Sequence, residues 1–200
     1  MKAKVLALAL LAAAAAPVSA GATVYHFQTA LSGLNEVPVV VTPGSGFGNM
    51  FWDDVAHTAT LDIVFQDLIG VTVASHTHSP TPGAPGPNFL VASTTPTYAG
   101  FPLGVSSGTY HVVLDLTSAT SWNPAFVTAW GGVTQAEAAL FSGLVAGQAY
   151  LNVHTDFRPG GEIRGTWALV PEPGVWTMLI AGFGAAGAML RRRRMAPALA

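Results

Sequence analysis

Three histidines stand in two short segments whose composition is typical of β-strands. His76 and His78 lie in the segment 71–78, and His154 lies in the segment 148–155. Side chains two residues apart in a strand point to the same face, so His76 and His78 can both reach one ion. A third imidazole would complete a ligand set that suits zinc, copper or nickel. The pattern therefore predicts a candidate zinc or copper site at His76, His78 and His154.

Other polar side chains lie on the same segments or beside them. Asn152 points the same way as His154, and Glu162 points the same way as Arg164 in the next predicted strand, 162–169. A Pro-Gly-Gly turn separates the two segments, which predicts that they form an antiparallel hairpin. An acidic side chain here could serve as an oxygen ligand or as a partner of a ligand. We therefore expect a polar cluster beside the histidines, made of Glu36, Asn152, Glu162 and Arg164.

A structural role is the first interpretation of these residues, and the metal site is the alternative to it. In the structural role the histidines would bind loop backbone, and Glu162 or Glu36 would pair with Arg164. Glu36 and Glu162 could also form the carboxylate pair of a glycosidase, but that chemistry needs a separation of ~5–9.5 Å that the sequence does not fix. No nucleophile elbow or phosphate-binding loop is present in the sequence. We expect a protein that is not an enzyme.

Composition restricts the range of functions further. The 200 residues suit one domain, and the chain contains no cysteine, which excludes disulfides, thiol catalysis and zinc sites built on cysteine. Between residues 21 and 170 there are nine acidic residues and two arginines, a net charge of about −7. No basic surface is expected, which argues against nucleic acid as a partner.

The N-terminus has the pattern of a secretion signal. Two lysines precede an apolar run over residues 5–16, and the sequence Pro-Val-Ser-Ala ends at Ala20. A basic start, an apolar segment of this length and small residues at the cleavage site are typical of a signal peptide. We expect residues 1–20 to be removed on export across the inner membrane, leaving a domain that covers residues 21–169.

The C-terminus combines three features in a fixed order. Residues 170–174 contain the triplet Pro171-Glu172-Pro173, residues 175–190 are mostly apolar, and residues 191–200 begin with Arg191, Arg192, Arg193 and Arg194. Sixteen helical residues would span about 24 Å, which is marginal for a ~30 Å hydrocarbon core. We predict a transmembrane sorting helix at 175–190, with the arginines in a basic cytoplasmic tail.

This C-terminal segment resembles the PEP-CTERM sorting signal of Gram-negative bacteria. The resemblance implies that an exosortase recognises the segment, cuts near the triplet, and releases or re-anchors the protein at the cell envelope. It also implies a link to exopolysaccharide production. A plain membrane anchor is the alternative interpretation.

The middle of the chain is dominated by strand patterns. In the segment 57–65, apolar residues alternate with polar ones, as expected of a half-buried strand. Further strands are predicted at 23–31, 71–78, 109–116, 148–155 and 162–169. Residues 79–107 are rich in Pro, Gly, Ser and Thr and predict a long surface loop, and residues 134–144 predict one short helix that begins with a capping box. We predict an all-β antiparallel sandwich, similar to immunoglobulin or superoxide dismutase folds.

Four motifs of this region resemble the CHRD domain, a module named after chordin. The order of the motifs agrees with that family, and they cover the segments 31–38, 74–78, 147–155 and 159–165. The resemblance implies a β-rich extracellular module with no established enzymatic activity. Together these features predict an exported envelope or matrix protein with a binding or structural role. A metal-binding or redox module is the alternative.

Overall fold

The computed structural model describes residues 24–171 and 173–194, and it contains nine strands and three α-helices there. The expected signal peptide and Glu172 lie outside the described residues. The strands are β1 (Val24–Ser32), β2 (Ser45–Asp53), β3 (Thr58–Gln66), β4 (Thr72–Ser79), β5 (Leu90–Val91), β6 (Gly108–Asp115), β7 (Tyr150–Thr155), β8 (Ile163–Thr166) and β9 (Ala168–Leu169). The helices are α1 (Pro124–Trp130), α2 (Val133–Val145) and α3 (Pro173–Arg194).

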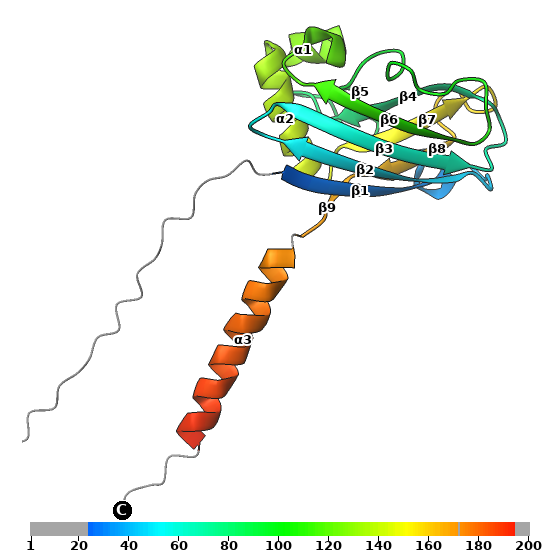
Figure 1. Ribbon diagram of the computed structural model, residues 1–200. Helices are drawn as coiled ribbons and strands as arrows, with labels where there is room; N and C mark the ends of the chain where they lie inside the picture. The colour runs from blue at the N-terminus through cyan, green and yellow to red at the C-terminus, as the bar shows by residue number, and fades with distance from the viewer. Residues whose placement is uncertain (1–23, 172, 195–200) are drawn as a thin grey trace, which may run out of the picture.

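All strands belong to one antiparallel sheet that curls into a half-barrel (Figure 1). The order across the sheet is β5-β4-β7-β8-β1-β2-β3-β6, with β9 paired to β1. The predicted all-β antiparallel class is confirmed. The prediction of two separate sheets differs from this structure because β1 pairs with β2 along its length and meets β8 through Ser32 and Arg164. That contact joins the two halves of the fold into a continuous sheet.

The hydrophobic core lies inside the curl. Apolar side chains on alternate positions of the strands point inward, as the pattern of β3 predicts. They are buried together with side chains from α1 and α2, which lie at one end of the barrel (Figure 1). The largest of these buried side chains include Trp52, Trp167, Phe27, Phe65 and Phe126. The side chains at the remaining positions of each strand point to the outer face of the sheet.

All six predicted strands are present, with bounds that shift by one or two residues. The last one is divided into β8 and β9 at Trp167. Two strands were not predicted, β2 and the two-residue β5.

The predicted single helix is in fact two. α1 begins with Pro124 after the cap Asn123, whose side chain accepts a hydrogen bond from Ala125 N, and α1 ends at Trp130 with Gly131 as its C-cap. The predicted capping box is wrong, because Gly132 caps α2 without a side-chain hydrogen bond and places Thr134 inside the helix. Glu137 instead pairs with His57, with 2.8 Å between Glu137 Oε1 and His57 Nδ1.

The long segment between β4 and β6 is attached to the domain rather than projecting from it. Backbone hydrogen bonds join Ala92 and Ser93 to Thr77, Tyr98 to Ser75, and Gly104 to Thr72. The segment thus covers the edge of β4, which would otherwise leave unpaired backbone groups. Tyr98 donates to Thr77 Oγ1 at 2.7 Å and stacks on Tyr110 of β6. It therefore bridges the two edges of the half-barrel.

α3 contains the arginine run and lies outside the β domain (Figure 1). Among the described residues, no helix has an apolar stretch long enough to cross a membrane. The transmembrane helix expected at 175–190 is therefore not confirmed.

We expect Gly165→Ala to destabilise the domain by more than about 2 kcal/mol, because overpacking at a close contact is costly. A methyl group there would collide with Thr29 Oγ1 and with the backbone carbonyl of Ala30 where β8 approaches β1. Gly160→Ala is the matched control, since no atom lies within 4 Å of the added group. Urea unfolding of both variants would test this, and equal midpoints would contradict it.

Candidate functional site

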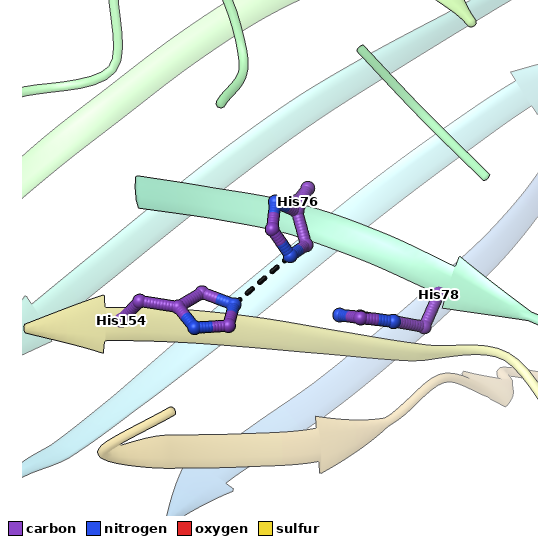
Figure 2. Close-up of side chains that lie close together, drawn as sticks. All are labelled: His76, His78 and His154. Carbon is purple, nitrogen blue, oxygen red and sulfur yellow. Dashed lines mark hydrogen bonds between the residues drawn. The ribbon is translucent and has the colours of Figure 1, made fainter. Parts of the chain in front are cut away.

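The three predicted histidines come together on the outer face of the sheet (Figure 2). His76 and His78 project from β4 and His154 projects from the neighbouring strand β7. One ring nitrogen from each lies within 4.8 Å of the other two. The predicted common direction of His76 and His78 is therefore correct, and β4–β7 pairing adds the third ring.

Each ring is held by a backbone carbonyl from a different part of the loops above the sheet. Nδ1 of His76 lies 2.8 Å from Pro96 O, Nδ1 of His78 lies 2.7 Å from Phe89 O, and Nδ1 of His154 lies 2.8 Å from Pro159 O. These loops also cover the rings, so that His76 is 7% exposed and His154 is 9% exposed. The outer face of the sheet is therefore buried by loops at this point.

The hydrogen bonds fix the protonation of the rings. A neutral imidazole carries one proton, and a carbonyl oxygen only accepts, so each Nδ1 must hold that proton. Each Nε2 then presents a bare lone pair. Figure 2 marks the short contact between Nε2 of His76 and Nε2 of His154, which are 2.9 Å apart. Two lone pairs at this distance repel each other unless a cation lies between them.

A proton is a poor candidate for that cation. Burial lowers the pKa of His76 to about 4, with a further contribution from His154, and burial also lowers the pKa of His154 itself. The pKa of His78 falls to about 3, again mainly through burial. At neutral pH all three rings are therefore neutral, which is the form that binds metal.

The cluster fits a transition-metal ion. Three imidazole nitrogens with their other nitrogen bonded to a carbonyl match the arrangement of metal-binding histidines, in which the outer partner orients the ring. Two nitrogens bound to zinc at ~2.0 Å in tetrahedral geometry are about 3.3 Å apart. To bind zinc, Nε2 of His76 and Nε2 of His154 would need to separate by a few tenths of an ångström. The separations within the three-histidine set extend to 4.8 Å, so the ring of His78 would also have to move toward the other two. Nε2 of His78 is buried and has no hydrogen-bond partner.

Arg164 supports the loop above His78. Its guanidinium lies 3.4 Å from the centre of the Tyr150 ring, and His78 stacks on the same ring at 4.6 Å. The two groups cannot share one face at those distances, so Tyr150 lies between them. Arg164 also donates to Asn88 Oδ1 and Pro87 O, both at 2.8 Å, and so fixes the segment that carries Phe89.

Tyr150 and the three carbonyls were not predicted as part of the site. The alternation of Tyr150, Asn152 and His154 along β7 could have indicated the tyrosine. Nothing in the sequence signals which loop carbonyls reach the rings.

Glu36 and Asn152 of the predicted polar cluster also lie at this site. Asn152 is the register partner of both His76 and Arg164, which places it in the middle of the outer face. Burial raises the pKa of Glu36 to about 7, and the charge of Arg164 opposes that rise. Arg164 therefore acts on Glu36 through its charge while its hydrogen bonds go to neutral acceptors.

Glu162 does not belong to this cluster. The turn before β8 directs its side chain to the other side, where Glu162 Oε1 accepts from Thr42 Oγ1 at 2.6 Å and from Ile69 N at 2.7 Å. Glu162 Oε2 accepts from Thr155 Oγ1 at 2.7 Å and from Gly70 N at 3.2 Å. Burial alone would raise the pKa of Glu162, but these hydrogen bonds outweigh it and lower the pKa. Glu162 therefore has a structural role, because its hydrogen bonds connect two loops with β7.

These observations define a class of protein, a curled antiparallel β domain whose loops fold over a polar outer face. A family model of the CHRD domain matches residues 27–167, and the chain belongs to that family. The PEP-CTERM protein-sorting motif matches residues 169–194, which marks an exported, envelope-associated protein that is processed by an exosortase. No curated protein and no solved structure matches the chain.

We expect Glu162→Gln to lower the free energy of unfolding at pH 7 by about 2 kcal/mol, because hydrogen bonds to a charged group are replaced by weaker ones. The lowered pKa means that the carboxylate stabilises the fold above its ordinary pKa of 4.5, and that this contribution is lost as the pH falls through the folded-state value. The difference from the parent protein should therefore shrink below pH 4.5.

Thermal unfolding across pH measures this effect, and Asp67→Asn makes the same chemical change at an exposed position. The control should shift stability by less than about 0.5 kcal/mol. A pH-independent gap between the Glu162→Gln protein and its parent would show that ionisation of Glu162 is not responsible.

Proposed function

We propose that this protein is an exported envelope protein whose CHRD domain binds one transition-metal ion through Nε2 of His76, His78 and His154. The observation that carries the proposal is the convergence of three bare lone pairs whose rings are held by carbonyls on the opposite nitrogen. A merely structural histidine gains a partner for both nitrogens where it can, whereas here Nε2 of His78 is buried and unpaired.

Zinc and copper are the ions we propose, since imidazole suits both and no thiolate is available to favour a softer choice. The role is binding rather than catalysis. Its proposed setting is the cell envelope, after removal of residues 1–20 and exosortase processing at the C-terminus. The link to exopolysaccharide production is also a proposal, and it rests on the PEP-CTERM motif alone.

The full-length chain, purified without a polyhistidine tag and loaded with zinc or copper, should hold about one ion per chain by elemental mass spectrometry. EDTA should remove it. Replacing His76 and His78 with alanine should reduce the content to below about a tenth, because removing two of three ligands leaves one imidazole. The His111→Ala variant is the matched control, since His111 is bonded to Asp62 on an exposed face.

Metal content that is equal in the double variant and in the control would refute the site. A folded chain without bound metal, whose thermal stability does not change when zinc or copper is added, would return the histidines to a structural role. Circular dichroism of each variant separates loss of metal from loss of fold.

A separate experiment addresses the sorting motif. We expect Glu172→Ala to block processing, because it removes the charge at the centre of the triplet. Intact mass and immunoblots of cells that contain an exosortase should show a longer chain that remains with the membrane fraction. Asp67→Asn, which lies in the β domain, should be processed normally. Identical processing of the two variants would count against recognition through the triplet.

A further inference from the structure

Two buried oxygen atoms beside the histidines lack a hydrogen-bond partner. They are Asn152 Oδ1 and Glu36 Oε1, from residues that are 3% and 5% exposed. Buried polar groups in folded proteins are nearly always paired, and an unpaired one costs about 1–3 kcal/mol. One hydrogen-bond donor placed between the two oxygens would satisfy both of them.

Gly161 lets these two oxygens lie close to the backbone of the turn, because a side-chain carbon there would collide with both of them. A side-chain carbon at Gly161 would stand 2.5 Å from Glu36 Oε1 and closer still to Asn152 Oδ1. The two oxygens are therefore no more than about 5 Å apart, a span that one water can bridge with two hydrogen bonds of ~2.8 Å. The backbone of Gly161, at φ +124°, favours glycine at this position.

The same place adjoins the histidine nitrogens. Asn152 lies opposite His76 in the register of β4 and β7, and it lies two residues from His154 on one face. Side chains opposite each other in a sheet have Cβ atoms about 4.5–5.5 Å apart. A molecule bonded to Asn152 Oδ1 can thus also reach an ion held by the three Nε2 atoms.

A cleft connects this place with solvent. It has a volume of ≈ 410 Å³, and Glu36, Pro159 and Gly161 are among the residues that line it. Pro159 is the residue whose carbonyl holds His154. The cleft therefore gives small molecules access to the side of the site where the unpaired oxygens lie.

We propose that the metal ion carries a fourth, exchangeable ligand, a water molecule whose two O–H groups donate to Asn152 Oδ1 and Glu36 Oε1. This inference rests on the proposed metal site. Three histidines plus one water form the open coordination that leaves a position for incoming ligands. A small anion that enters through the cleft replaces the water on the metal.

Copper(II) and azide provide the test, using the full-length chain loaded with copper. Pulsed electron paramagnetic resonance should show protons close to the copper that disappear in D₂O. Azide should remove that signal and produce an azide-to-copper charge-transfer band. Both results are expected because azide displaces the water from the fourth position.

Two variants test the acceptors. Asn152→Leu removes one acceptor from the water, so azide should compete more successfully and bind about three- to tenfold more tightly. Glu36→Leu should act in the same direction, and its position in a loop makes it the safer variant for folding. Asn49→Leu is the matched control, because Asn49 bonds with His26 and Gln28 on β1.

The outcomes separate the two proposals. Failure to bind copper would refute the three-histidine site itself. Bound copper without exchangeable protons and without an azide band would leave that site standing and overturn the fourth ligand. If exchangeable protons are present but both variants bind azide with the same affinity as the control, the assignment of Asn152 and Glu36 as acceptors of the water is overturned.

Discussion

The hydrogen bonds from three Nδ1 atoms to three loop carbonyls are the constraint on which the site depends. An imidazole has one proton to give in its neutral form, and the carbonyls of Pro96, Phe89 and Pro159 use it. The remaining nitrogens are then acceptors by necessity. The loops that supply the carbonyls also cover the rings, so a single arrangement determines the direction, the protonation and the burial of the rings.

The curled sheet makes this arrangement possible because one face of β4 packs on the hydrophobic core and the other face is covered by loops. Within β4, Ser75, Thr77 and Ser79 face the core, where Thr77 contacts Tyr98 and Trp167. The histidines of the same strand face outward and are buried by loops. The segment 92–106 contributes to both faces, because its backbone pairs with the edge of β4 and its Pro96 carbonyl holds His76. Tyr98 and Phe101 of this segment also belong to the hydrophobic core, so the same loop contributes to the core and to the polar site.

Strand periodicity explains which parts of the site the sequence could predict. It placed His76 with His78 and Asn152 with His154, because side chains alternate in any regular strand. It failed for Glu162, since the turn at Gly161 breaks the alternation before β8 begins. The contact between β4 and β7 joins residues 78 positions apart, such as His76 and His154, and no local pattern encodes it. β2 escaped prediction because Gly46 and Gly48 interrupt its pattern where Leu31 and Trp167 need room.

The charges around the histidines are compatible with a cation despite the nearness of Arg164. The guanidinium is directed to the Tyr150 ring, Asn88 and Pro87, and therefore lies beyond the tyrosine as seen from His78. Glu36 supplies a carboxyl on the same face, and burial raises its pKa to about 7. A divalent ion nearby would favour the ionised carboxylate, since an opposite charge stabilises it. Cation binding and ionisation of Glu36 therefore reinforce each other, and the local charge changes less than the charge of the ion alone.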